Sequence, residues 1–167
     1  ILSTINGLKK LGTQIILKKN KCLVYGAGLN SFNYKKGISI DAGNSGTFAR
    51  LLLGLLIKSP FQIKIFGDKS LSRRDFLRVI SPLEKFGAKF KSYRKSQLPL
   101  KILGTEFLKP INYLENRGSA QCKSSVIFAG MRAEGTTYIK AKKSRDHTEL
   151  LCKHLRLPIF IKKKKKL

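Results

Sequence analysis

The chain has 167 residues, of which 42% are hydrophobic, so it can fold around a core and does not belong to the disordered class. Its 35 basic and 9 acidic residues give a formal net charge of +26, which favours anionic partners. No apolar run reaches the length of a membrane span and no signal peptide is recognisable, so we expect a cytoplasmic protein without membrane contact. The three cysteines do not stand at metal-ligand spacings, which indicates free thiols and no metal site.

Both ends of the sequence indicate a piece of a longer protein. The chain begins at Ile1, without Met and already within a helical pattern, and it ends in the lysine run 162–166 after a strand-like segment. We interpret the lysine run as a solvated edge that binds polyanions without specificity.

The basic charge leaves two interpretations open. It comes mainly from Lys, it is spread over the whole chain, and aromatic residues do not interleave with it as a stacking platform for bases would require. We therefore expect no specific nucleic-acid partner, because a lysine-biased genome together with anionic substrates explains the charge as well. A basic, non-catalytic nucleic-acid-binding domain remains the alternative.

Apolar periodicity and turn residues predict alternating strands and helices along the chain. A helix ends near residue 10, and strands follow at residues 13–17, 21–25 and 38–40. A helix within residues 43–56 precedes a strand at 61–66, a helix that opens at 72–74, and strands at 88–93 and 98–103. The last elements are a short strand at 112–114, a helix within 118–131, a strand at 136–141 and a helix that opens at 144–146.

These elements repeat at a spacing of about 70–75 residues, and the repeating unit has the order βαβαββ. Residues 8–15 parallel 83–90, residues 43–56 parallel 118–131, residues 72–74 parallel 144–146, and residues 152–159 are a weaker copy of 8–15 without its Gly. We divide the chain into the tail of one unit (1–36), one whole unit (37–104) and most of another (105–167). No linker separates the units, so we expect a single domain.

The repeat predicts a mixed α/β (α+β) fold in which the units surround a pseudo-threefold axis. Apolar helix faces would fill the centre with sheets outside, and the helix N-termini would converge at one end. The residues expected at the centre include Leu51, Leu52, Leu55, Phe76, Val79, Ile80 and Leu83.

Polar and basic residues gather where the expected helices begin. Backbone N–H groups and hydroxyls at the positive end of a helix suit a carboxylate or phosphate. Each start alone is explained by ordinary capping, but their recurrence at equivalent places favours one shared anion site. The segments are 44–47 with Arg50, 67–74, 119–121 with Lys123, and 144–147.

The sequence offers no evident general base. The carboxylates of Asp41, Asp68, Asp75, Asp146 and Glu149 all adjoin helix starts, where capping accounts for them. We interpret His147 as a first-turn residue oriented by Asp146 or Glu149, and His154 as a packing residue.

The same stretches, in the same order, resemble the bacterial 5-enolpyruvylshikimate-3-phosphate synthases (3-phosphoshikimate 1-carboxyvinyltransferases). The sister family that transfers enolpyruvyl to UDP-N-acetylglucosamine shares the fold and the Asn-x-Gly-Thr turn, and remains an alternative. Residues 119–121 and 144–149 favour the shikimate branch. The matching stretches are 43–47 with 50–52, 67–74, 98–100, 118–124, 129–130 with 134–137, and 144–149.

The resemblance implies an inverse α/β prism, here incomplete, in a two-domain enzyme of six units that is a monomer when full length. It implies transfer of the carboxyvinyl group of phosphoenolpyruvate to the 5-hydroxyl of shikimate 3-phosphate through a tetrahedral intermediate, with release of phosphate. That step belongs to the shikimate pathway, which leads to chorismate and the aromatic amino acids, and it is the target of glyphosate. No metal or organic cofactor is implied.

The resemblance also implies roles for residues at matching positions. Asn44, Gly46, Arg74 and Gln121 would bind phosphoenolpyruvate. Shikimate 3-phosphate would be held by Ser119, Ala120, Gln121, Ser144 and Arg145. Thr47 and Arg50 would support the first turn.

Two departures from the family pattern accompany these matches. Asp75 stands where the family often has Pro, and Arg117 stands where it is usually apolar. The proton-transfer residues of the family lie outside this sequence, so its catalytic residues are unknown. We expect the chain alone to bind substrates poorly and to be inactive.

Overall fold

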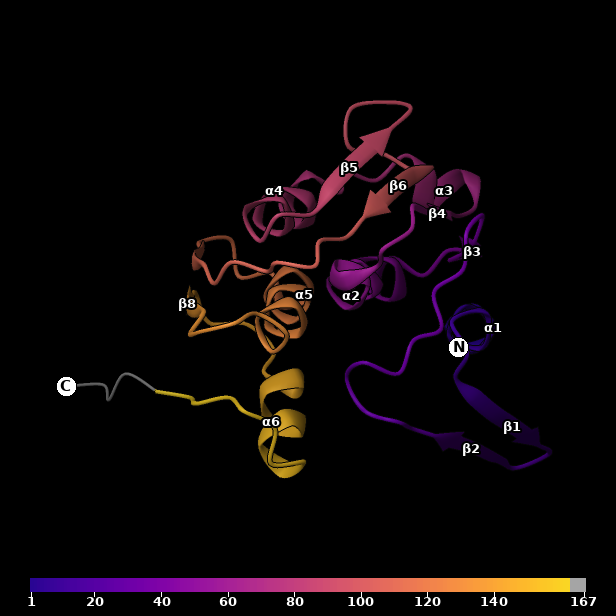
Figure 1. The fold of residues 1–167 in the computed structure, drawn as a ribbon, viewed down its shortest axis with the longest axis horizontal. Coiled ribbons are helices and arrows are strands. Elements are labelled where there is room, and N and C mark those ends of the chain that lie inside the picture. Colours follow the sequence, from indigo (N-terminus) through magenta and orange to yellow (C-terminus); the bar gives the residue numbers. More distant parts are fainter. Residues whose placement is uncertain (163–167) are drawn as a thin grey trace.

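The computed structural model describes residues 1–162, which form helices around a centre with strands outside them (Figure 1). The helices are α1 (Leu2–Lys10), α2 (Gly46–Leu55), the 3-10 turn η1 (Leu56–Lys58), α3 (Lys69–Ser72), α4 (Leu77–Lys85), α5 (Ala120–Gly130) and α6 (His147–His154). The strands are β1 (Gln14–Lys18), β2 (Lys21–Tyr25), β3 (Ser39–Asp41), β4 (Ile63–Phe66), β5 (Lys89–Ser92), β6 (Leu100–Leu103), β7 (Asn112–Glu115) and β8 (Tyr138–Ala141).

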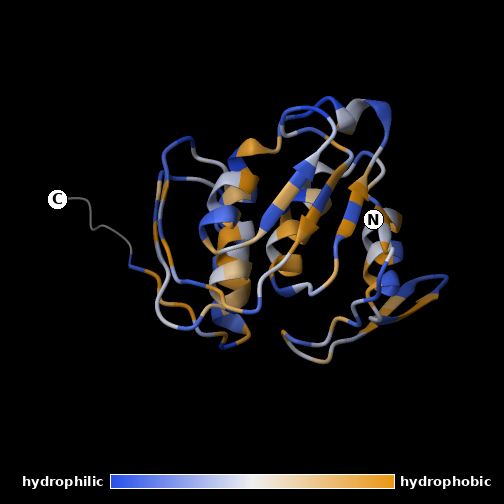
Figure 2. Ribbon diagram, turned by 45° about the horizontal axis from the view of Figure 1, so that its top comes forward, coloured by the Kyte–Doolittle hydropathy of each residue, from blue (hydrophilic) through white to orange (hydrophobic). Residues whose placement is uncertain are grey.

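The middle of the chain forms a four-stranded sheet in the order β3-β4-β6-β5. β3 and β4 are parallel and are joined through α2, whereas β6 is antiparallel to both β4 and β5. α4 connects β4 to the β5–β6 hairpin, so this part of the chain follows the order βαβαββ. Apolar and polar residues alternate along these strands, because one sheet face packs on the helices and the other meets solvent (Figure 2).

The two flanking parts repeat portions of that arrangement. β7 and β8 are parallel and are joined through α5, as β3 and β4 are joined through α2. At the other end, α1 leads into the antiparallel hairpin β1–β2, as α4 leads into β5–β6.

The core lies where α2, α4 and α5 pack against one another (Figure 1). Leu52, Val79 and Val126 are fully or almost fully buried there. The prediction that helices occupy the centre is confirmed for Leu52, Phe76, Val79, Ile80 and Leu83, whereas Leu51 and Leu55 are only half-buried.

α2 and α5 approach each other very closely at Gly54. A Cβ atom on Gly54 would lie 2.2 Å from the backbone oxygen of Ser125, which is closer than atoms can pack. A side chain at position 54 would therefore force the two helices apart, and the missing side chain sets their spacing.

A left-handed residue ends the helix at three equivalent places. Gly12 follows α1 at φ +89° and Gly87 follows α4 at φ +110°. The third place, after α6, is held by Arg156 at φ +53°. The weaker third copy therefore keeps the backbone conformation of the other two although it lacks their glycine.

Some sequence expectations are wrong. No helix opens at residues 72–74: Asp68 caps the short α3, and α4 begins only at Leu77. The late start of α4 has a long-range cause. The backbone N–H of Phe76 donates to the backbone oxygen of Ser96 in the β5–β6 turn, and this contact holds the residue just before the helix. His154 is exposed rather than packed, and residues 159–161 form no strand.

Two further observations concern the chain as a whole. The lysine run 162–166, expected to be a solvated edge, lies outside the described residues beyond position 162. Within residues 1–162, no helix has the length and apolar character needed to cross a membrane.

Candidate anion-binding site at the helix starts

The turn before α2 is fixed by its own polar side chains. The Asp41 carboxylate accepts a hydrogen bond from the Gly43 N–H at 2.8 Å, and Gly43 itself has φ +54°. The Ser45 hydroxyl accepts from the Phe48 N–H at 3.2 Å and so caps the helix. The turn thereby presents the positive end of α2 on a fixed backbone.

A hydrogen-bond chain joins the starts of α2 and α5. Arg50 donates from Nη1 to Oε1 of Gln121 at 3.0 Å, and Gln121 donates from Nε2 to the Thr47 hydroxyl at 2.7 Å. Nη2 of Arg50 donates to the backbone oxygen of Asp75 at 3.2 Å, and the guanidinium lies 4.8 Å from the centre of the Phe76 ring. Gln121 thus connects two equivalent helices, and Arg50 bonds both to the backbone oxygen of Gly46 in its own turn and to Gln121 of α5.

Arg74 brings a second guanidinium to the same place. Its Nη2 donates to the Asn44 side-chain oxygen at 3.1 Å. A Cβ atom on Gly46 would lie 2.8 Å from Nη1 of Arg50 and 3.1 Å from Nη1 of Arg74. Gly46 therefore leaves the room in which both guanidinium groups sit.

The charges around Arg50 are mainly positive, with the Asp75 carboxylate as the acidic group among them. Burial lowers the pKa of Arg50, and nearby Arg78 and Arg74 lower it further, whereas Cys122 and Asp75 have the opposite effect. Since Gln121 and Asn44 are neutral, their hydrogen bonds orient the guanidinium groups without neutralising them. An anion placed here would relieve the repulsion.

The start of α5 is held by buried acidic and basic groups. The Ser119 hydroxyl caps the helix through the Cys122 N–H at 3.3 Å. The Glu115 carboxylate, which is buried, accepts from the backbone N–H groups of Ser119 at 2.7 Å and Arg117 at 3.2 Å. Ala120, the first residue of the helix, is half-buried.

The start of α6 lies beside that of α5. Lys123 is buried, forms a salt bridge with Glu149, and donates to the backbone oxygen of Arg145 at 3.1 Å. The Ser124 and Thr148 hydroxyls are 2.7 Å apart. The Ser144 hydroxyl is buried and has no hydrogen-bond partner within residues 1–162.

These contacts confirm that the starts near Ser45, Ser119 and Ser144 share one face of the domain. Asn44, Gly46, Thr47, Arg50, Arg74 and Gln121 form one connected group. Ser119, Ala120, Ser144 and Arg145 form its neighbour around Lys123, although the Arg145 side chain is exposed.

Sequence reasoning missed two features of the site. The Lys123–Glu149 salt bridge joins α5 to α6, and Glu115 holds the turn before Ser119. Glu115 could have been found, because it is the last residue of β7 before a glycine turn, as Asp41 is the last residue of β3.

The arrangement can bind two anionic groups, but it has no evident proton-transfer pair. His147 is exposed. Within residues 1–162, no group of His, Cys, Asp or Glu side chains is placed to hold a metal ion.

The fold and the helix-start site define the class: a repeated mixed α/β domain in which basic and polar side chains meet where the helices begin. The sequence profile of EPSP synthase (3-phosphoshikimate 1-carboxyvinyltransferase) matches residues 1–166, and the chain belongs to that family. Among curated relatives, the 3-phosphoshikimate 1-carboxyvinyltransferases of Caldicellulosiruptor saccharolyticus and Bacillus subtilis are 46% and 41% identical to it, over 91% and 89% of this chain. EPSP synthase from Acinetobacter baumannii superposes with a TM-score of 0.84 at 35% identity over 91% of the chain.

The superposition confirms the predicted mixed α/β fold of the inverse-prism type. The chain spans about a third of the length of these relatives, 35% in each case. The activity of a whole protein of this family is therefore a proposal for this chain.

Proposed function

We propose that this chain supplies substrate-binding residues to an enzyme that transfers the carboxyvinyl group of phosphoenolpyruvate to the 5-hydroxyl of shikimate 3-phosphate. The hydroxyl oxygen forms a bond to the substituted carbon of phosphoenolpyruvate and gives up its proton, while a proton adds to the methylene carbon and the double bond becomes a single bond. The tetrahedral adduct then loses phosphate together with one proton of the new methyl group, which restores the double bond. The proposal rests on family membership and on one observation: the chain Arg50–Gln121–Thr47 joins two helix starts beside Arg74.

Phosphoenolpyruvate fits the first group of residues by its charge. It carries a carboxylate and a phosphate, and Arg74 and Arg50 bring two guanidinium groups around Gly46. Asn44 orients Arg74, and Gln121 has hydrogen-bond donors and acceptors for both substrates. A guanidinium can grip either anion with two parallel hydrogen bonds.

Shikimate 3-phosphate fits the second group. Ser119 and Ala120 begin α5, and Ser144 and Arg145 precede α6, so a 3-phosphate would meet N–H groups, hydroxyls and a guanidinium. The buried Ser144 hydroxyl has no partner within residues 1–162, which leaves it available to a ligand oxygen.

The remaining parts of the proposal come from the family resemblance and from the repeat, composition and charge pattern of the sequence. Residues of a second domain perform proton transfer, and the units divide at residues 1–36, 37–104 and 105–167. The enzyme works in the cytoplasm as a monomer, without a cofactor and without a specific nucleic-acid partner.

A chimera tests the proposal. The matching segment of the Bacillus subtilis relative, 35% of that protein, is replaced by this chain, and steady-state kinetics are measured with each substrate varied in turn. We expect carboxyvinyl transfer to shikimate 3-phosphate. A folded chimera that is inactive, or that prefers UDP-N-acetylglucosamine as acceptor, would refute the proposal.

Two variants of the chimera test the residue assignments. Arg74→Ala should cost about 2–5 kcal/mol in kcat/KM for phosphoenolpyruvate, because a charge-assisted contact is lost in a closed site. Gln121→Ala should cost about 1–3 kcal/mol and weaken both substrates. The neighbouring Arg73→Ala is the matched control. A change within about twofold for Arg74→Ala would remove Arg74 from the site.

A further inference from the structure

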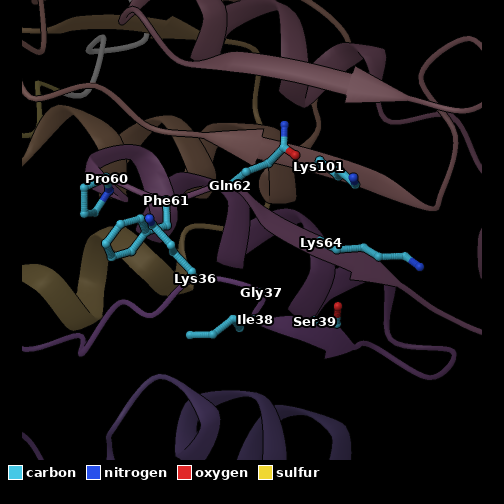
Figure 3. Close-up of a pocket in the computed structure, with 9 residues that line it drawn as sticks. All are labelled: Lys36, Gly37, Ile38, Ser39, Pro60, Phe61, Gln62, Lys64 and Lys101. Atoms are coloured by element: carbon cyan, nitrogen blue, oxygen red, sulfur yellow. The ribbon is translucent and has the colours of Figure 1, made fainter.

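A basic pocket lies on the sheet, away from the helix-start site (Figure 3). Its volume is about 430 Å³ and it opens between the start of β3 and the neighbouring strands β4 and β6. None of its lining residues is acidic, and none belongs to the helix-start site. They are Lys36, Gly37, Ile38, Ser39, Pro60, Phe61, Gln62, Lys64 and Lys101.

Lysines are aligned across the sheet at this pocket. Lys64 of β4 lies directly opposite Lys101 of β6, which in turn lies opposite Lys91 of β5. Residues paired in this way share one sheet face about 5 Å apart, and like charges at such positions destabilise a sheet. The one salt bridge within residues 1–162 is Lys123–Glu149, so no carboxylate in the described structure neutralises this row.

Two of the pocket lysines rest against aromatic rings. The Lys36 amine lies 5.9 Å from the centre of the Phe61 ring, and the Lys64 amine lies 5.7 Å from that of Phe66. Figure 3 shows Lys64 and Lys101 on neighbouring strands with both side chains directed toward the same side, and Lys36 beside Phe61. Such contacts hold the cations in place without neutralising them.

We propose that this pocket binds the phosphate chain of a polyphosphate anion. A repulsive row of exposed amines is stabilised best by a ligand that carries several linked negative charges, because one such ligand contacts neighbouring amines together. Because the Lys36 amine lies over the Phe61 ring, that ring is not free to stack on a nucleobase. The pocket would therefore recognise the phosphate chain of a ligand and not its base. Ser39 and Gln62 add neutral donors to the three amines.

Calorimetric titration of the 167-residue chain with inorganic tripolyphosphate tests the proposal, at about 0.15 M salt to suppress diffuse attraction. The double variant Lys64→Gln/Lys101→Gln removes the pocket pair. Lys18→Gln/Lys21→Gln is the matched control, because Lys18 and Lys21 are also directly opposite each other but lie in the β1–β2 hairpin, outside the pocket. We expect the pocket variant to bind about tenfold or more weakly and the control to change less than about twofold.

Parallel titrations define the ligand. Tripolyphosphate and a nucleoside triphosphate should bind with similar affinity, and orthophosphate about tenfold or more weakly. Equal losses in the two double variants would show that binding follows net charge, and would overturn the proposal. So would a single-stranded oligonucleotide that binds more tightly than tripolyphosphate in the pocket variant and the original chain alike. An unchanged or higher melting temperature confirms that the pocket variant is folded.

Discussion

At the scale of single residues, a neutral side chain organises a basic site. The side-chain oxygen of Gln121 accepts a hydrogen bond from Arg50, and its side-chain nitrogen donates one to Thr47, so this residue of α5 bonds twice to α2. The sequence placed Arg50 with the segment 44–47, and the family resemblance gave it a supporting role there, but no local pattern reveals its partner 71 positions away. The residue types at helix starts were predictable, but their pairing depends on how α2 packs against α5.

Asp75 gives a pH-dependent prediction. Burial would raise its pKa, but hydrogen bonds from the Ser96 hydroxyl and the Leu77 N–H outweigh that effect, and the pKa is lowered. The folded state therefore gains stability above the pKa of an unfolded Asp and loses it as the pH falls. We expect Asp75→Asn to destabilise the chain near neutral pH by less than about 1 kcal/mol, because the carboxylate is exposed.

Urea unfolding of the original chain and of Asp75→Asn over a pH series measures this effect. The difference between the two should shrink as the pH falls below about 4. A difference that stays constant into strong acid would mean that the charge of Asp75 contributes nothing.

At the scale of elements, the close approach of α2 and α5 predicts a strong effect at one glycine. Gly54→Ala should destabilise the chain by about 1–3 kcal/mol, because the new methyl group meets the Ser125 backbone and the helices must shift. The free energy of unfolding in urea measures it. Gly26→Ala is the control, since nothing lies within 4 Å of its Cβ position. Equal effects of the two substitutions would contradict the packing argument.

At the end of α6, in contrast, we predict a substitution that raises the free energy of unfolding. Arg156 adopts a left-handed conformation that favours glycine, so Arg156→Gly should stabilise the chain by about 0.5–1 kcal/mol. Arg156→Ala removes the same charge and keeps the backbone strain, so thermal unfolding of both variants separates the two causes. If the alanine variant gains as much as the glycine variant, the benefit comes from the lost charge.

The sequence predicted which helices and strands occur better than it predicted the residues at which they begin and end. Periodicity and the repeat located the main helices and strands, and even the weaker third copy keeps the left-handed helix end at Arg156. The false helix start at residues 72–74 arose because the Phe76 backbone bonds to Ser96, a contact that depends on a distant turn. Some strands, such as β4, β6 and β8, begin later than predicted, because pairing across the sheet decides where a strand starts and stops.

At the scale of the whole molecule, the net charge of +26 predicts how the chain meets polyanions. Binding to DNA or RNA should be non-specific and should weaken steeply with salt, because scattered lysines release counterions from the phosphate backbone. Titrations of several sequences at rising salt measure both properties. A preference of several kcal/mol for one sequence would support the alternative of a nucleic-acid-binding domain.

The open edge of β8 bears on the colloidal behaviour of the chain. Within residues 1–162, β8 pairs with β7 alone, whereas β4, in the equivalent position, also accepts β6. An unpaired strand edge is a template for another strand, and the like charge of the copies opposes their encounter. Salt screens that repulsion over about 10 Å at 0.1 M. High salt, which releases polyanions from this chain, therefore also allows its copies to associate most readily.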